Sequence, residues 1–203
     1  YINDIYMYPN KNAQISNTSF TCDKYLVEYD NVVYYVDRDG LWRNTGKEEG
    51  ELLYDCEATN IATNGEVIYY SVYHKDVTAF CKEYNQYDLY SYDLRTSLNS
   101  KVTSFNECGK PICYYNGKIY YTDYNDDFNG FVTGLAQSLY SYDLSTGEKE
   151  YISDKAGIVI PHGSSIYFRD MLASMDLSSA QIQCLDLTNG KVKQITSDGV
   201  SEM

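Results

Sequence analysis

The side chains most suited to binding a metal ion lie in one acidic segment near the middle of the chain. Asp123, Asn125 and Asp127 place oxygen atoms at alternate positions, and hard cations such as Ca²⁺ prefer oxygen ligands. An EF-hand loop needs glycine at its sixth position and glutamate at its twelfth, where this segment has Phe128 and Gly134. We therefore interpret the segment as a solvated loop, with Ca²⁺ binding as the alternative, and expect no other cofactor.

Side chains that could act in catalysis form no known motif. The two histidines, His74 and His162, are far apart in the sequence, and neither belongs to an H-E-x-x-H motif. A G-x-S-x-G nucleophile motif is also absent. Two carboxylates could meet in the fold to hydrolyse a glycoside, but the sequence does not pair them. We expect a protein without enzyme activity, and a glycan-active enzyme is the alternative.

Six cysteines could form disulfides or bind metal: Cys22, Cys56, Cys81, Cys108, Cys113 and Cys184. Their even number is compatible with disulfides, but a chain of 203 residues does not need them to build a core. No C-x-x-C pairs with zinc-site spacing are present. We interpret most of them as small buried apolar residues; disulfides and metal ligation are the alternatives.

An internal repeat defines the elements that position these residues. Four segments share an apolar residue followed by Tyr and then Tyr or Phe, and the first tyrosine of each is Tyr34, Tyr69, Tyr120 or Tyr167. The spacing from one of these tyrosines to the next is similar to the length of a propeller blade. Aromatic and β-branched residues favour strands, and the composition, with 24 tyrosines and 3 prolines, favours an all-β fold.

Further strands surround each of these segments. The string Leu-Tyr-Ser-Tyr-Asp-Leu occurs at 89–94 and at 139–144, and a diverged copy follows at 182–187. Asn189-Gly190 follows the last of these strings and is typical of a hairpin turn. Asn64-Gly65 and Asn116-Gly117 each follow another short apolar strand. Each unit therefore reads strand, turn, strand, loop, strand, turn, strand.

This order predicts a β-propeller of four-stranded antiparallel blades. We expect about four complete blades plus a partial one, in a single domain or part of a domain over residues 1–203. The expected limits are 16–54, 55–105, 106–153 and 154–196, with the partial blade at 1–15. A short arc of blades leaves open edges, so we expect a larger ring of which this chain is a piece.

Repeated residues within the units are expected to be structural. Alternate residues on a strand face opposite sides, so one tyrosine of each pair is expected to pack between blades. Asp93, Asp143 and Asp186 recur where the third strand ends, and aspartate caps such turns by accepting backbone N–H groups.

Two long second-to-third-strand loops, 73–88 and 124–138, are the expected binding elements. Insertions in repeat folds gather on one face, which is often the binding face. The aromatic residues that we assign to ligand contact in these loops are Phe80, Tyr84, Tyr87, Phe128 and Phe131. Plain surface loops are the alternative.

Charge and hydropathy narrow the class of partner. The formal net charge is −13 and the sequence pI is about 4.4, so the surface repels phosphate backbones and nucleic acid is not an expected partner. No apolar stretch reaches the roughly 20 residues that span a bilayer, so we expect no membrane insertion by this segment.

The motif Tyr-Tyr-x-Asp, as at 120–123, followed by Leu-Tyr-Ser-Tyr-Asp-Leu, resembles the YWTD propellers of low-density-lipoprotein-receptor-type proteins. It is more similar to the bacterial DUF5050 domains, and this resemblance covers nearly the whole chain. It implies a relative with six blades, an extracellular or cell-surface setting and a Gram-positive bacterium as the source. We therefore expect a non-catalytic module that recognises protein or carbohydrate through one propeller face, with a structural spacer in a larger surface protein as a further alternative.

Overall fold

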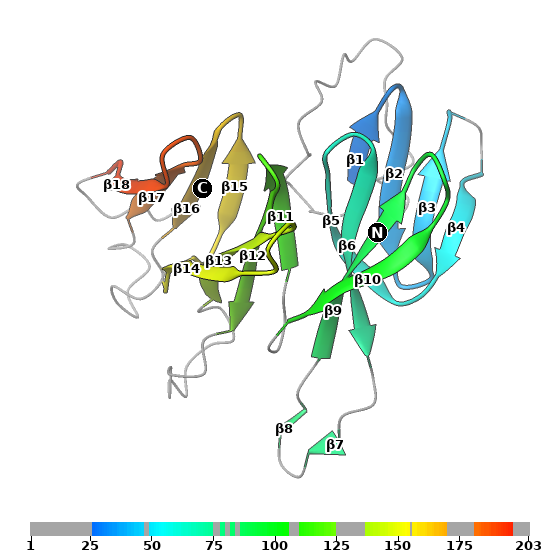
Figure 1. Cartoon of the computed structure of the whole chain (residues 1–203), viewed down its shortest axis with the longest axis horizontal. Coiled ribbons are helices and arrows are strands. Elements are labelled where there is room, and N and C mark those ends of the chain that lie inside the picture. Colours follow the sequence, from blue (N-terminus) through cyan, green and yellow to red (C-terminus); the bar gives the residue numbers. More distant parts are fainter. Residues whose placement is uncertain are drawn as a thin grey trace.

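The computed structural model of this chain is built from β-strands, and the residues that it describes form no helix (Figure 1). It describes residues 26–46, 49–74, 78–79, 82–83, 86–105, 110–124, 137–154, 156–169 and 181–196. Over these ranges, no helix is long and apolar enough to cross a membrane. The expected partial blade at 1–15 lies outside the described residues.

The strands form four antiparallel four-stranded sheets, which we call the first to fourth blades. The first blade contains β1 (Leu26–Tyr29), β2 (Val32–Asp37), β3 (Gly40–Asn44) and β4 (Glu51–Asp55). The second contains β5 (Ala58–Thr63), β6 (Val67–His74), β9 (Gln86–Asp93) and β10 (Asn99–Ser104), and β7 (Thr78–Ala79) pairs with β8 (Lys82–Glu83) between β6 and β9. The third contains β11 (Lys110–Tyr115), β12 (Lys118–Tyr124), β13 (Gln137–Asp143) and β14 (Lys149–Ser153). The fourth contains β15 (Val159–His162), β16 (Ser165–Arg169), β17 (Ile182–Asp186) and β18 (Lys191–Gln194).

Each blade is a meander in which strands that follow one another in the blade pair antiparallel. The Tyr-Tyr segments form the second strands and the Leu-Tyr-Ser-Tyr-Asp strings form third strands, so that Tyr70 is opposite Tyr90 and Tyr121 is opposite Tyr140. The predicted all-β class and the predicted four-stranded antiparallel blades are confirmed.

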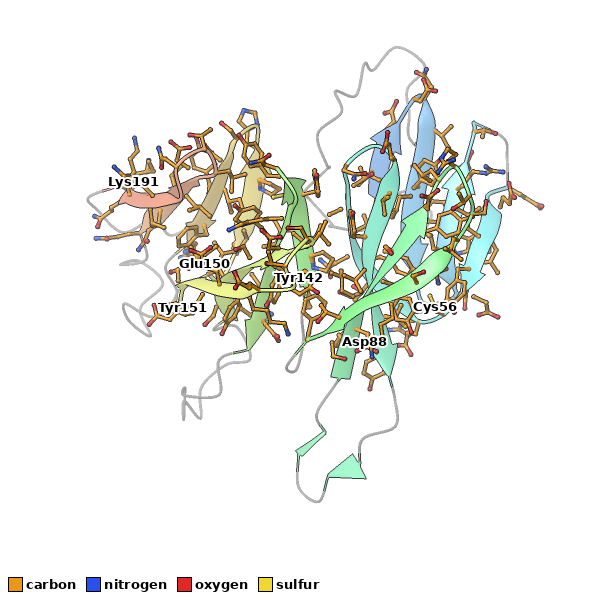
Figure 2. The ribbon with its side chains drawn as sticks, viewed as in Figure 1. Cys56, Asp88, Tyr142, Glu150, Tyr151 and Lys191 are labelled. Carbon is orange, nitrogen blue, oxygen red and sulfur yellow. The ribbon has the colours of Figure 1, made fainter. Side chains whose placement is uncertain are left out.

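The first strand of each blade lies on the inside and the fourth strand on the outside. β5 lies against β1 and β2 on one side and against β11 on the other, and β11 also contacts β15. The outer strands are the exposed ones: β18 is exposed along its whole length, and Tyr151 of β14 lies at the surface (Figure 2). The blades therefore pack side by side around their first strands (Figure 1).

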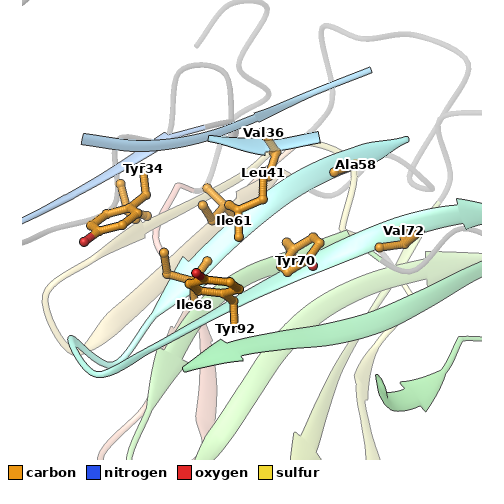
Figure 3. Packing of buried hydrophobic residues seen from close by; sticks show 10 residues of the cluster. Tyr34, Val36, Leu41, Ala58, Ile61, Ile68, Tyr70, Val72 and Tyr92 are labelled. Atoms are coloured by element: carbon orange, nitrogen blue, oxygen red, sulfur yellow. The ribbon is translucent and has the colours of Figure 1, made fainter. Parts of the chain in front are cut away.

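Three apolar cores fill the gaps between consecutive blades. The core between the first and second blades contains Val36, Leu41, Ile61, Ile68 and Tyr70, among others (Figure 3). A second core joins the second blade to the third, and another joins the third to the fourth. Burying one leucine or isoleucine contributes about 1.5–3 kcal/mol, so these interfaces carry much of the stability of the fold.

Consecutive aromatic residues of a Tyr-Tyr strand belong to different cores. Tyr69 packs in the core shared with the third blade, where its ring stacks on Tyr114 with centroids 6.1 Å apart, while Tyr70 packs in the core shared with the first blade. Tyr120 and Tyr121 divide in the same way. The expectation of one packing tyrosine per pair was therefore incomplete, because a blade with neighbours on both faces buries both residues.

Candidate functional site

The two ends of each blade carry different kinds of connection. Strands of a meander alternate in direction, so the first-to-second and third-to-fourth connections lie at one end and the second-to-third connections lie at the other. Turns at the first end are short, and several of their residues have positive φ, including Asn31 at 61°, Asn116 at 47° and Gly117 at 81°. Asparagine and glycine tolerate that conformation best. We call this end the turn face.

Aspartate side chains fix three of the turns on the turn face. Asp143 Oδ1 accepts hydrogen bonds from the backbone N–H groups of Ser145 at 2.9 Å and Thr146 at 3.1 Å. Asp93 Oδ1 accepts equivalent bonds from Arg95 and Thr96, and Asp186 Oδ1 accepts one from the backbone N–H of Thr188. The hydroxyls of Ser145 and Thr188 also donate to Asp143 and Asp186. Hydrogen bonds lower the pKa of all three carboxyl groups, chiefly these hydroxyl bonds at Asp143 and Asp186 and the backbone bond from Thr96 at Asp93, because they favour the charged form. The predicted capping role is confirmed.

The opposite end carries the long connections, and we call it the loop face. Residues 75–85 connect β6 to β9, 125–136 connect β12 to β13, and 170–181 connect β16 to β17. β6 and β12 both run toward the lower end in Figure 1, where the β7–β8 hairpin extends beyond the ends of β6 and β9. The first two connections were predicted from the sequence; the third, which follows the shorter strand β16, was not.

In the first blade the corresponding connection is a tight turn. Asp37, the last residue of β2, is opposite Gly40, the first residue of β3. Asp37 Oδ1 accepts hydrogen bonds from the N–H groups of Asp39 and Gly40 and from Nε1 of Trp42, at 2.8, 3.0 and 2.9 Å. The blade architecture therefore closes without a long loop, and the inserted residues of the other blades are not needed to complete the sheet.

Of the five aromatic residues assigned to ligand contact, the structure describes Tyr87. This half-buried residue of β9 has its ring 5.3 Å from that of Tyr73 on β6, and its carbonyl accepts a hydrogen bond from Phe105 N–H at 3.0 Å. It packs at the edge of the core between the second and third blades. Tyr87 thus forms the base of the loop face. The other four lie outside the described residues: Phe80, Tyr84, Phe128 and Phe131.

Of the three possible Ca²⁺ ligands, the structure describes Asp123, and it is not a surface loop residue. Asp123 belongs to β12, is 2% exposed and is opposite Ser138 of β13. Asn125 and Asp127 lie outside the described residues. Across the described ranges, no three side chains of His, Cys, Asp or Glu gather closely enough to hold a metal ion by themselves. Any cation at Asp123 would need other oxygen ligands as well.

A second buried carboxylate at the loop face was missed by the sequence analysis. Asp88 lies on β9 near the base of the 75–85 connection (Figure 2), and its side chain is 7% exposed. It forms an ion pair with Lys101 of β10, whose Nζ is 2.6 Å from Asp88 Oδ2. The sequence signal available for Asp88 was its position in the repeat. Asp88 directly precedes Leu89, and Ser138 directly precedes Leu139 at the equivalent position of the third blade.

The described cysteines, Cys56, Cys113 and Cys184, are free thiols. Cys113 and Cys184 are buried, as expected for small apolar residues, and Cys56 is partly buried. Burial raises the pKa of Cys56 and of Cys113 to about 12. Since the thiolate is the nucleophile and the metal ligand, these two side chains are not primed for either chemistry.

Solved structures with the same arrangement of blades are β-propellers. The chain is similar to putative TolB from Agrobacterium tumefaciens, with a TM-score of 0.58 and 14% identity over 80% of this chain and 60% of that one. It is also similar to TolB from Acinetobacter baumannii, with a TM-score of 0.50 and 21% identity over 81% and 41% of the two chains. Tricorn protease gives a TM-score of 0.53 and 14% identity over 84% and 21%.

These similarities define the class of fold. The structural similarity shows a β-propeller fold. Sequence identities of this size show no shared activity. No protein-family model and no curated protein matches the sequence. The chain spans 60% of the first TolB structure and less than half of the other two.

Proposed function

We propose that this chain is a non-catalytic recognition module that binds a protein or a carbohydrate through its loop face. The observation that carries the proposal is the contrast between the two ends of the blades. Aspartate-capped turns close one end, whereas connections far longer than the fold requires leave the other. Binding residues are commonly carried by loops that a rigid scaffold positions.

The strands support such loops close to their ends. His74 is opposite Gln86, and Tyr124 is opposite Gln137, so the sheet is paired up to the residues where each long connection starts and finishes. The three inter-blade cores hold these strands in place. A fixed base lowers the entropy that a loop loses when it binds a partner.

The finer identity and the location of the protein rest on the sequence motifs. We propose that the chain is a divergent relative of the DUF5050 and YWTD-type propellers and acts outside the bacterial cytoplasm, with a Gram-positive source as that resemblance implies. The net charge of −13 favours a neutral or basic partner surface over a polyanion.

The test replaces two of the three long connections, one at a time, by a two-residue turn. Because His74 is opposite Gln86 and Tyr124 is opposite Gln137, Asn-Gly in place of 75–85, or of 125–136, can close each hairpin as a type I′ turn. Wild type and both variants are screened against a displayed peptide library and an array of bacterial polysaccharides. We expect wild type to select one ligand class and at least one variant to bind it about tenfold more weakly.

A matched control changes the turn face and keeps its fold. The triple variant S145T/T146N/E148K gives the third blade the turn residues of the fourth, and it should bind like wild type. Equal binding by wild type and both loop variants would exclude residues 75–85 and 125–136 as the binding surface and would contradict the proposal in this form. Cleavage of an arrayed polysaccharide by wild type would instead identify an enzyme, and failure to select any ligand would favour a structural spacer.

A further inference from the structure

The hydroxyl group of Ser138 is buried without a hydrogen-bond partner. Ser138 is 0% exposed, and its Oγ makes no hydrogen bond. Leaving a buried polar group unsatisfied destabilises a fold, so such groups usually have an ordered partner. An alanine at this position would fill nearly the same space without leaving a buried hydroxyl unsatisfied.

Ser138 lies beside a buried carboxylate and faces the same gap between blades. It is opposite Asp123, and side chains of directly opposite residues share one face of a sheet, with Cβ atoms about 4.5–5.5 Å apart. Tyr121 and Tyr140, each two residues along the same strands, belong to the core between the second and third blades. Asp123 and Ser138 therefore face the second blade, on the loop-face side of that core.

Aromatic rings lie on the core side of this pair, and a polar side chain lies across the gap on the second blade. The ring of Tyr121 is 4.8 Å from that of Phe105. Across the gap, Ser71 of β6 is 0% exposed and is opposite Leu89, a residue of the same core.

We propose that Asp123 and Ser138 are ligands in a site for one hard cation of the Ca²⁺ class, between the second and third blades at the loop face. A carboxylate and a hydroxyl oxygen are the donors that such a cation takes. The cation would give Ser138 Oγ its missing partner and would compensate the buried charge of Asp123. Asp123 has another interaction, but a carboxylate offers about four acceptor positions.

This site differs from an EF-hand-like loop in what holds the ion. The two ligands come from neighbouring strands in fixed register, not from successive loop residues, and backbone carbonyls or water must complete the oxygen shell. The cation would join two strands directly below the 125–136 connection. The inference stands apart from the proposed recognition function, since a cation site can exist whether or not the loops bind a partner.

The neighbouring residue Thr122 provides a matched control. Thr122 is also 0% exposed and its Oγ1 also makes no hydrogen bond, but it is opposite Leu139, which packs in the core with the fourth blade. T122V therefore removes a buried hydroxyl of the same kind on the other face of the sheet. S138A and D123N remove the two proposed ligands.

The experiment measures the affinity of each purified chain for Ca²⁺ by calorimetry, and its melting temperature with 5 mM Ca²⁺, Mg²⁺ or EDTA. A ligand that binds only the folded state raises the melting temperature, so Ca²⁺ should stabilise wild type and T122V. S138A should weaken Ca²⁺ binding by about tenfold or more while melting in EDTA no lower than wild type, because it loses only an unsatisfied hydroxyl. D123N should abolish the Ca²⁺ response.

Two results would overturn the proposal. One is a wild-type melting temperature that Ca²⁺ leaves unchanged, together with no heat of binding. The other is an S138A variant that binds Ca²⁺ as tightly as T122V does. Since S138A removes no hydrogen bond of the folded protein, it remains informative even if D123N does not fold.

Discussion

Tyr69 and Tyr70 are consecutive residues of β6 that stabilise two different blade interfaces. Tyr69 stacks on Tyr114 of the third blade, whereas Tyr70 is 0% exposed in the core with the first blade (Figure 3). The Tyr70 hydroxyl also donates a hydrogen bond of 2.8 Å to Asn99 Oδ1 in the outer strand of its own blade. One dipeptide thus connects a blade to both neighbours.

We predict that Y70A destabilises the protein by about 3–5 kcal/mol, the range for truncating a buried aromatic residue. Y70F, which keeps the ring and removes the hydrogen bond to Asn99, should cost about 1 kcal/mol. Urea unfolding followed by circular dichroism measures both values. Similar losses for the two variants would mean that the hydroxyl, not the packing of the ring, provides the stability.

Gly40 cannot accept a side chain without a change in the first blade. Its φ is +149°, and an added Cβ would overlap the carbonyl oxygen of Tyr54 in the adjacent strand. We predict that G40A costs about 3 kcal/mol, at the upper end for overpacking. G46A is the control: φ is +84° there and nothing lies within 4 Å of the added Cβ, so only the conformational cost of about 1 kcal/mol remains. Fluorescence of Trp42, the single tryptophan, reports unfolding of this blade.

The three capping aspartates on the turn face predict a loss of stability in acid. The pKa of each carboxyl group is lower in the folded state than the unfolded value of about 3.9. Their contribution is therefore fully present above that unfolded pKa and is lost as the pH falls through the lowered folded values. The variant D93N/D143N/D186N keeps an acceptor oxygen at each turn but cannot titrate. Its melting temperature should fall less than that of wild type between pH 5.5 and pH 2.5, and equal falls would contradict the prediction.

The Asp88–Lys101 pair should couple more strongly than an ordinary surface pair. Asp88 is nearly buried while Lys101 is 48% exposed, so removing the lysine leaves a carboxylate with little solvent around it. We predict that K101M costs about 1–2 kcal/mol, less than the loss expected for a fully buried pair. A double-mutant cycle with D88N isolates the interaction. A coupling energy near zero would show that solvent screens the pair completely.

Much of the scaffold could be predicted because its signals are local and repeated. The Leu-Tyr-Ser-Tyr-Asp string is identical in β9 and β13, and the capping aspartates need only the two or three residues after them. The opposite roles of Tyr69 and Tyr70 were harder to predict, since they depend on neighbouring blades on both faces. Periodicity shows that the two rings point in opposite directions but not what covers each of them.

The candidate site was harder to predict because one repeat position has different roles in different blades. Asp37 and Asp123 are at the same position of the repeated Tyr-Tyr segment, yet Asp37 caps a tight turn and Asp123 is buried beside Ser138. The difference arises from the length of the connection that follows: a two-residue turn offers its N–H groups to the carboxylate at once. Ser138 carried no signal of its own, because an unsatisfied hydroxyl becomes visible only in three dimensions.

The pairing of His74 with Gln86, and of Tyr124 with Gln137, has a consequence for how such proteins diversify. The closure entropy of a flexible loop rises by only about 0.6 kcal/mol for each doubling of its length, so insertions between residues that are already paired have little effect on the scaffold. The turn face has no such freedom, because its carboxylates must meet N–H groups two or three residues further on. Selection can therefore vary the length and sequence of the loop-face connections, whereas changes in the turn-face connections are selected against.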